Sequence, residues 1–295
     1  MRLSSLRASS QKRAGEQLPY AGAPVGVSTV DTVSRPRRRR LRSEIAYYFD
    51  VLVSLTASDL RDRYGRGRAP FLKWLLDPFA VSGIYLLLVA FLLNRPGGEP
   101  GLVIVCAVVP FQLIMMAVVN GMGAISGRRG IVLNMGFPRV LIPLSSVFTD
   151  TSVFAASFVL IAAMMAGYAV VPTTALAWLP PVVVLNFGFA LACAYPASLF
   201  GAWFSEFRVF AASIVRTLFF LAPGLVTLAQ VHGRAHDLVK LNPLTGIFEA
   251  YRSVFLYGHR PALWELAYPL VWTLVLAAAF VPLYAREQRH FAKLI

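Results

Sequence analysis

The sequence predicts an all-α polytopic membrane protein: six transmembrane helices with an N-terminal interfacial amphipathic helix and an outer re-entrant helical segment. Three observations support this class. Of the 295 residues, 57% are hydrophobic and only 14% are charged, whereas a soluble domain has about 25% charged residues. Apolar runs of ~20 residues, long enough to cross a bilayer, recur along the chain. The basic residues concentrate before the first run, with 15 of the 28 Lys and Arg residues lying between Arg2 and Lys73.

The N-terminal region divides into two parts. Residues 1–43 lack apolar periodicity and contain an arginine-rich run from Arg35 to Arg42, so we expect a disordered basic cytoplasmic tail. The run could bind anionic lipid head groups or act only as a positive-inside signal. Residues 44–70 begin with an apolar stripe at helical spacing, which predicts a helix lying in the membrane interface; packing on a partner or on the bundle is the alternative. The stripe consists of Ile45, Tyr48, Phe49, Leu52, Val53, Thr56 and Leu60.

Residues 71–285 contain six segments that are long and apolar enough to span a bilayer. They are Phe71–Leu93, Gly101–Ser126, Pro143–Val171, Leu176–Trp203, Val209–Gln230 and Leu263–Ala285. Six spans that start from a cytoplasmic N-terminus also place the C-terminal tail, residues 286–295, in the cytoplasm. In this orientation 22 of the 28 basic residues lie on the cytoplasmic side and five outside, as the positive-inside rule expects.

The loop at residues 127–144, between the second and third predicted spans, is short, basic and free of carboxylates. It is predicted to be cytoplasmic, and we interpret it as the place where a soluble partner presses on the membrane domain. The expected partner-coupling residues are Arg128, Arg129, Ile131, Val132, Met135, Phe137, Pro138 and Arg139.

The outer segment at residues 231–262 is not an ordinary loop. Asn242 and Pro243 form a good helix start, with Asn at the N-cap and Pro at the first helical position. The helix of about 14 residues that follows is too short to span, so we predict an amphipathic or re-entrant helix that seals the outer end of the bundle. Glu249 and Arg252 would lie on its polar side; a plain surface helix is the alternative. The expected outer gate consists of Asn242, Pro243, Phe248 and Tyr251.

Two charges lie inside predicted spans, where charged side chains are costly and usually face a polar interior. Asp150 in the third span and Arg216 in the fifth are both ~10–12 Å from the cytoplasmic side, because each helical residue rises ~1.5 Å. Because Asp150 and Arg216 lie at the same depth in the membrane, they could form an ion pair. Arg216 could instead contact the phosphate of an anionic substrate. The pattern Gly123–Gly127 has GxxxG spacing and predicts a close helix contact.

Signatures of enzymes and of metal sites are scarce. The sequence contains no Gly-Lys pair and hence no Walker A loop, and it lacks HExxH, GxSxG and DDxxD motifs. His232 and His236 lie at i and i+4 near Asp237 and are a conceivable metal site. Such a pair of histidines in an outer loop is far more often incidental, so we predict no metal and no cofactor on this chain. The formal net charge of +14 reflects topology signals, which argues against nucleic acid as a partner.

A series of motifs resembles the membrane subunit of ABC-2 type exporters of the polysaccharide, O-antigen and teichoic-acid kind. They occur in the expected order from about Ile45 to the C-terminus. The motifs are Arg63-Tyr64, Leu75-Leu76-Asp77-Pro78, Phe137-Pro138-Arg139 with Leu141, Pro143 and Leu144, Phe219–Pro223, Asn242–Gly246, Glu249–Arg252 and Phe291–Ile295. The chain departs from the pattern at Lys73 and before Phe137, where Leu133 and Asn134 replace the usual lysines.

This resemblance implies a permease subunit of an ATP-driven exporter that moves a lipid-linked cell-surface polysaccharide across the bacterial cytoplasmic membrane. It also implies a homodimer that contacts membrane lipids and two copies of a separate ABC ATPase, which would carry the ATP and Mg. A drug or small-lipid exporter and a polytopic lipid-linked sugar transferase remain as alternatives. The substrate entrance and conduit would include Arg63, Tyr64, Lys73, Phe79, Tyr85, Arg216, Phe219 and Phe220, whose rings could stack on sugars or simply pack.

Overall fold

The computed structural model describes residues 37–65, 76, 79–80, 83–84, 100–130, 138–288 and 290–291. The chain divides into two units, Met1–Arg42 and Ser43–Ile295, and the contacts discussed below all lie within the second. Predicted features in residues 1–36, most of the first span and the middle of the 127–144 loop lie outside the described residues.

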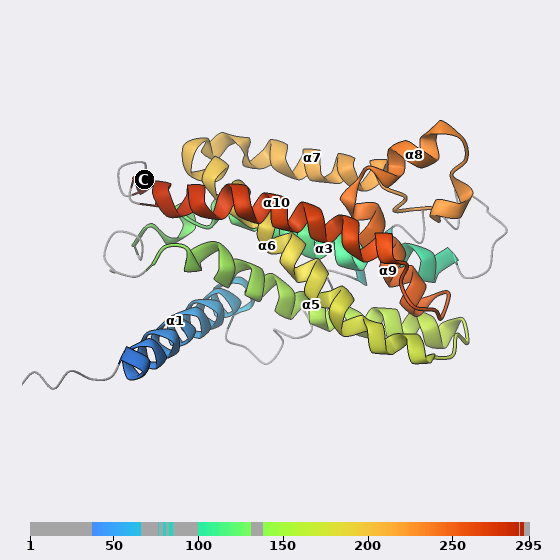
Figure 1. Ribbon diagram of the computed structural model, residues 1–295, viewed down its shortest axis with the longest axis horizontal. Helices are drawn as coiled ribbons and strands as arrows, with labels where there is room; N and C mark the ends of the chain where they lie inside the picture. The colour runs from blue at the N-terminus through green and yellow to red at the C-terminus, as the bar shows by residue number, and fades with distance from the viewer. Residues whose placement is uncertain are drawn as a thin grey trace, which may run out of the picture. The chain divides into compact units, whose positions relative to one another are not determined.

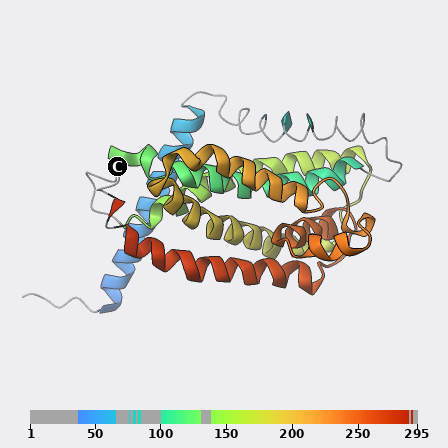
Figure 2. The same cartoon turned by 90° about the horizontal axis from the view of Figure 1, so that it is seen from above.

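The described residues form eight α-helices and no strand, which confirms the predicted all-α class. The α-helices are α1 (Arg37–Tyr64), α3 (Pro100–Gly123), α5 (Leu141–Gly167), α6 (Leu179–Trp203), α7 (Arg208–Leu221), α8 (Arg234–Lys240), α9 (Pro243–Phe255) and α10 (Leu263–Glu287). Short 3-10 helices are η2 (Ser126–Arg128), η3 (Thr174–Trp178), η4 (Ser205–Phe207) and η5 (Leu228–Gln230). The helices α3, α5, α6, α7 and α10 run lengthwise beside one another, as Figures 1 and 2 show.

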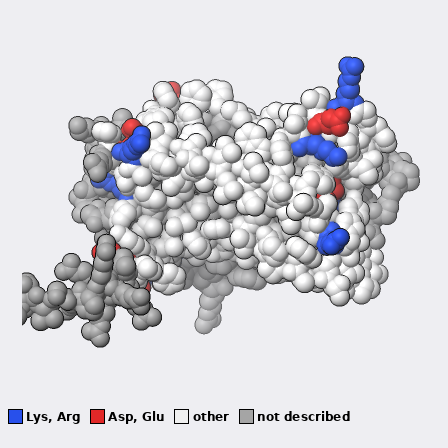
Figure 3. All heavy atoms as spheres, viewed as in Figure 1, with Lys and Arg blue, Asp and Glu red and all other residues white. Residues whose placement is uncertain are grey.

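Among the described residues, four helical segments are long and apolar enough to cross a membrane: Gly101–Gly123, Leu141–Gly167, Thr174–Trp203 and Leu263–Glu287. They coincide with the second, third, fourth and sixth predicted spans. On the face seen in Figure 3, the charged side chains gather toward the two ends, and the surface between them is uncharged. This band is what a bilayer with a hydrocarbon core of ~30 Å requires.

The fifth predicted span is shorter than expected. Helix α7 has 14 residues and ends at Leu221, so it is only ~21 Å long and falls short of the hydrocarbon core. The cause is Pro223, which lacks an N–H and disfavours the helical conformation of the residue before it. Ala222 is accordingly extended, with ψ of 159°. The fifth predicted span, Val209–Gln230, is therefore not one continuous helix.

Helix α3 occupies the centre of the bundle and packs against α5, α6, α7 and α9. Its residues Leu102, Val105, Val109 and Leu113 are all fully buried or nearly so. Glycines bring α3 and α6 together: a Cβ on Gly201 would collide with the Met122 backbone. Small residues commonly permit this close approach between membrane helices.

The predicted helix contact at Gly123–Gly127 is not the one that the structure forms. A Cβ on Gly123 would lie 3.1 Å from the Arg208 guanidinium, and one on Gly127 would meet nothing within 4 Å. Gly123 is the last residue of α3, and its lack of a side chain leaves room for Arg208. The close contact of helices lies elsewhere, at Gly121 and Gly201.

Helix α9 differs from the predicted amphipathic helix. Its N-cap is as expected, because the Asn242 side chain accepts a hydrogen bond of 3.0 Å from the Leu244 N–H. However, every residue from Leu244 to Phe255 is buried. Glu249 and Arg252, which were predicted to occupy a polar side, are 6% and 0% exposed. The helix has no solvated face because its charged residues satisfy one another and the surrounding backbone.

Candidate functional site

One buried polar cluster joins the end of α1 to α3 and α5. The Arg63 Nη1 atom donates to Oδ1 of Asp150 at 2.6 Å, and the Asn120 amide donates to the same oxygen at 2.8 Å. Asp150 is fully buried. Since a buried carboxylate is costly without partners, this pair attaches the last turn of α1 to the transmembrane helix α5.

The predicted pair between Asp150 and Arg216 is therefore corrected: Asp150 pairs with Arg63. Arg216 is exposed on α7, and no carboxylate pairs with it among the described residues. The reason is the orientation of α7, which packs inward through Val215 and Phe219. Position 216 then points outward, so equal depth in the membrane does not bring the two charges together.

Arg128 forms a second connection between α1 and α5. Its Nε and Nη2 atoms donate to the Asp59 carboxylate, while Nη1 donates to the Ile142 carbonyl at 3.1 Å and Nη2 to the Ser146 hydroxyl at 3.2 Å. Burial lowers the pKa of Arg128 to about 10, so the guanidinium remains charged at neutral pH. Arg128 was predicted to contact a partner protein, but its donors are used within the chain.

Arg139 connects the other end of the loop to the end of α10. Its Nη1 atom donates to the Gln288 carbonyl, and the Tyr284 hydroxyl donates back to the Arg139 carbonyl at 3.2 Å. The Tyr195 hydroxyl of α6 donates to the adjacent Val140 carbonyl at 3.3 Å. The loop is therefore held by three different helices, and Arg139, like Arg128, serves the fold.

A small apolar cluster supports this end of the molecule. Tyr284 and Phe291 are fully buried in it, with ring centroids 5.2 Å apart, and they pack with Ile142 and Leu199. Phe291, the first residue of the predicted C-terminal motif, therefore has a structural role beneath the loop. Sequence reasoning had noted the motif but assigned it no contact.

Of the predicted coupling residues that the structure describes, Arg128 and Arg139 form contacts within the chain. Arg129 is exposed. Ile131, Val132, Met135 and Phe137 lie outside the described residues, as do the side chain of Tyr64 and the residues Lys73 and Tyr85. Among the other predicted conduit aromatics, Phe79 is 36% and Phe220 59% exposed, whereas Phe219 is fully buried. Phe219 packs on Phe111, with ring centroids 4.5 Å apart, so it is a core residue and not a sugar platform.

A second buried ion pair lies at the opposite end of the helices. Arg252 Nη1 donates to Glu249 Oε1 at 2.8 Å, and the guanidinium also donates to the Val103 carbonyl at 3.2 Å and the Gly224 carbonyl at 3.1 Å. Glu249 Oε1 accepts from the Leu228 N–H at 3.0 Å. The pair fixes the loop after α7 to α3 and α9. In the sequence, only the i, i+3 spacing of Glu249 and Arg252 indicated that these two residues could pair.

The predicted outer-gate residues are packed and hydrogen-bonded. Asn242 Nδ2 donates to the Leu218 carbonyl at 2.8 Å, which connects the start of α9 to the end of α7. Phe248 and Tyr251 are fully buried, and Phe248 contacts the Phe219 ring at a centroid distance of 5.7 Å. In this structure Asn242, Phe248 and Tyr251 contact neighbouring helices at the end of the bundle.

No group of three or more histidine, cysteine, aspartate or glutamate side chains that could hold a metal ion is found in the described part of the chain. His236, one of the two histidines considered above, has its Nδ1 atom 3.1 Å from the Val231 carbonyl. The polar clusters of the structure therefore consist of ion pairs and capped backbone groups, which can join helices.

Comparison with known proteins shows which proteins the chain is similar to. The chain is similar to the O-antigen export system permease protein RfbA of Myxococcus xanthus, with 26% identity over 75% of this chain and 85% of that protein. Two proteins of the same name from Klebsiella pneumoniae are 22% and 21% identical over 74% of the chain. The chain is a homologue of O-antigen export permeases. No family model matches the sequence.

This homology confirms the resemblance to ABC-2 type export permeases that the motifs predicted. The chain matches these relatives over about three quarters of its length, and over 85% of theirs. Together with the four candidate spans, the relatives point to a multi-pass protein of the inner membrane and to a transport subunit of an export system.

Proposed function

We propose that the permease moves a lipid-linked cell-surface polysaccharide out of the cytoplasm, powered by a separate ABC ATPase that binds ATP and Mg. The relatives support this proposal because each is called a permease of an O-antigen export system. The observation that carries it is the junction at which Arg128 and Arg139 join the loop ends to α1, α5 and α10, while Arg63 joins α1 to α5.

The orientation follows from the distribution of basic residues. With the loop and both termini in the cytoplasm, 22 of the 28 Lys and Arg residues are inside, in agreement with the positive-inside rule. The junction then faces the compartment that contains ATP. A cytoplasmic ATPase can reach it without entering the membrane.

The junction gives a physical route by which a push on the loop would move several helices. Asp59 and Arg63 are four residues apart on α1, so they lie on the same face one turn apart. One binds Arg128 at the loop and the other binds Asp150 on α5. A displacement of the loop start therefore shifts α1 and α5 together, while Arg139 conveys a displacement of the loop end to α10.

The substrate path is proposed to lie on the exposed side of α7, in a homodimer with two ATPase copies. Arg216 and Phe220 are one turn apart on this side, and both are exposed. Arg216 could attract an anionic phosphate, and Phe220 offers a ring on which a sugar could slide. Phe219, which was considered for the same role, is excluded from the path by its burial.

The coupling role is tested by two neighbouring arginines with different surroundings. We expect Arg129→Glu to abolish co-purification with the ATPase and to leave the thermal unfolding of the permease unchanged, because Arg129 is exposed. Arg128→Glu should instead lower the melting temperature, because it places a carboxylate beside Asp59. An Arg129→Glu permease that still binds and stimulates the ATPase would contradict the coupling role.

Transport itself is measured in proteoliposomes that contain the permease and its ATPase. The expected result is movement of a lipid-linked glycan that requires ATP hydrolysis and is lost with a hydrolysis-deficient ATPase. Sugar transfer by the permease alone would favour the transferase alternative. Movement of drugs or simple lipids without glycan movement would favour the other exporter alternative.

A further inference from the structure

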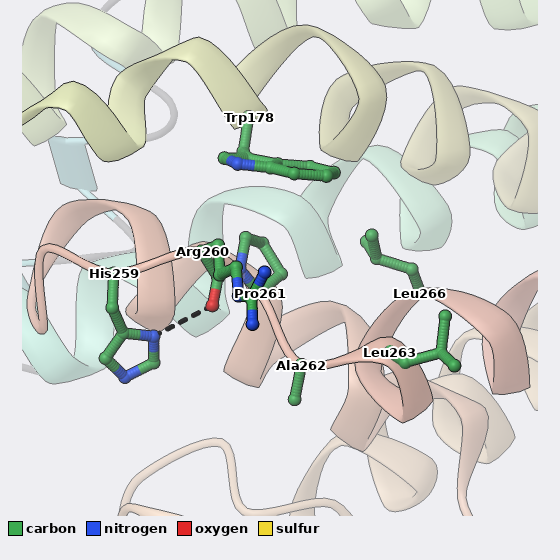
Figure 4. Close-up of a pocket in the computed structure, with 7 residues that line it drawn as sticks. All are labelled: Trp178, His259, Arg260, Pro261, Ala262, Leu263 and Leu266. Atoms are coloured by element: carbon green, nitrogen blue, oxygen red, sulfur yellow. Dashed lines mark hydrogen bonds between the residues drawn. The ribbon is translucent and has the colours of Figure 1, made fainter.

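A hollow of about 670 Å³ lies at the end of the molecule opposite the junction. Its walls are η3, which precedes α6, and the segment that leads into α10. Figure 4 shows the Trp178 indole on one side of the hollow, with Arg260 and Pro261 across from it and Leu263 and Leu266 further along. None of these residues belongs to the proposed coupling junction or to the proposed substrate path.

The two walls are held in place by hydrogen bonds, so the hollow is a built feature. The Thr173 hydroxyl donates to the Gly258 carbonyl at 3.2 Å and caps η3 by accepting from the Ala175 N–H at 3.3 Å. Gly258 has a φ of +68° and lies so close to Thr173 that a Cβ would be 3.0 Å from its methyl group. A glycine is required for both reasons.

The next residues are fixed in a similar way. The His259 N–H donates to the Ser253 carbonyl at 3.0 Å. Its ring Nδ1 is 2.9 Å from the Arg260 carbonyl and must carry the proton, because a carbonyl can only accept. The His259 ring also stacks on Tyr257 at a centroid distance of 5.6 Å. Arg260 is therefore presented from an ordered segment.

One part of the hollow is cationic. The Arg260 side chain has neither a carboxylate nor a hydrogen-bond acceptor as partner among the described residues. The nearby Glu265 carboxylate accepts from the Ser253 hydroxyl at 3.0 Å and from the Ala262 N–H at 3.1 Å, and Glu265 is only 7% exposed. The lining thus offers a positive charge with five fixed N–H donors and no carboxylate that would attract a cationic group.

The other part is apolar and continues along a candidate membrane span. Leu263 is 83% exposed, and Leu270 and Leu274, at i+7 and i+11, are 47% and 60% exposed. These positions share one face of α10, so an apolar stripe runs from the hollow down the helix. Trp178 lies at the start of the α6 span, and Trp is enriched at such membrane–water boundaries.

We propose that this hollow binds the head group of an anionic phospholipid of the surrounding bilayer. The phosphate is held by the Arg260 guanidinium, which suits phosphate oxygens through paired N–H donors. The glycerol region lies against Trp178, and one acyl chain follows the Leu263, Leu270 and Leu274 stripe. This site does not depend on the transported substrate, and it would anchor the non-coupling ends of α6 and α10 to one leaflet.

The test uses the whole purified permease, with lipid retention measured by native mass spectrometry. We expect phosphatidylglycerol to be retained in preference to phosphatidylcholine. Arg260→Gln should weaken phosphatidylglycerol retention by about tenfold, in line with the loss of a charge-assisted phosphate contact. Arg260→Lys should keep part of the retention, because it keeps the charge but not the paired donors.

The matched control is Arg234→Gln, which removes an exposed arginine from α8 and should leave retention unchanged. Phosphatidylglycerol with a photoreactive group beside its phosphate should label Leu263–Leu266 in the wild type and not in Arg260→Gln. Equal retention of the two lipids by the wild type, or equal losses in the two glutamine variants, would overturn the proposal. Melting temperatures of all variants confirm that the permease is folded.

Discussion

At the scale of single residues, the permease uses its buried charges to hold helices together. Asp150 receives donors from both Arg63 and Asn120, and Arg252 joins Glu249 to two backbone carbonyls. Each cluster connects segments far apart in the sequence. Removing one member of a buried pair leaves the other uncompensated, and this costs more free energy than the pair contributes when intact.

A double-mutant cycle distinguishes the observed Asp150–Arg63 pair from the Asp150–Arg216 pair that was expected because both residues lie at the same depth in the membrane. Asp150→Asn should destabilise the permease by about 3 kcal/mol, at the low end of values for buried pairs, because Arg63 is 28% exposed and can be hydrated. Arg63→Gln in the same chain should add little further loss. Arg216→Gln should leave the melting temperature unchanged and should add independently to Asp150→Asn. Coupling between positions 150 and 216, measured by denaturation in detergent, would refute this assignment.

The failure to predict the Asp150 partner has a simple physical origin. Counting residues from the membrane boundary gives the depth of a side chain, but not the direction in which it points. The direction depends on which face of α7 packs inward, and a count of residues along the span does not include that information. Arg63 was assigned to the substrate entrance, and nothing in the sequence indicated that it would reach a residue 87 positions away.

At the scale of helices, the contact between α3 and α6 depends on backbone proximity. Gly201 faces the Met122 backbone, and Gly121 approaches the Ala194 carbonyl, where a Cβ would lie at 3.1 Å. Backbone atoms cannot move aside as a flexible side chain can. The two helices can therefore pack at this distance only while these positions have no side chain.

Two glycine-to-alanine substitutions test which glycines matter. Gly201→Ala should force α6 away from α3 and lower the melting temperature strongly, by the equivalent of about 1–3 kcal/mol, the usual cost of overpacking. Gly127→Ala should be neutral, because no atom lies within 4 Å of the added methyl group. The comparison needs only thermal unfolding in detergent. If Gly127→Ala lowered the melting temperature more than Gly201→Ala, the result would support the helix contact expected from the GxxxG spacing.

Helix boundaries were predictable to the extent that hydropathy determined them. The segments that became α3, α5, α6 and α10 are long apolar runs, and their expected spans coincide with the helices. Helix α7 also lies in an apolar run, but the geometry of Pro223 ends it at Leu221. The burial of α9 was missed because Glu249 and Arg252 look like surface residues until their partners are known.

At the scale of the whole molecule, the two ends of the bundle differ in chemistry. One end contains Arg63, Arg128 and Arg139, joined to a loop. The other contains the buried pair Arg252–Glu249 and the hollow at Arg260. Positive charge is more frequent at the first end, which agrees with a cytoplasmic location for it. This asymmetry makes a single orientation in the membrane the expected state.

Site-directed labelling tests that orientation. A cysteine at Arg129 should react with a membrane-impermeant maleimide only after the cytoplasmic side is opened, and a cysteine at Arg234 should react in intact spheroplasts. Both side chains are exposed, whereas Cys106 is fully buried. Cys193 is replaced by serine in both variants to remove background labelling. Labelling of the Arg129 position from outside would reverse the proposed topology.

The burial of Phe291 beneath the loop has a consequence for biosynthesis. The transmembrane helices are made first, but the ends of the loop that joins α3 to α5 lack this aromatic support until Phe291 has left the ribosome. A chain that stops at Glu287 would contain all the described α-helices and still lack the ring that packs on Tyr284. If the proposed ATPase binds at this loop, its binding would therefore favour chains that extend at least to Phe291.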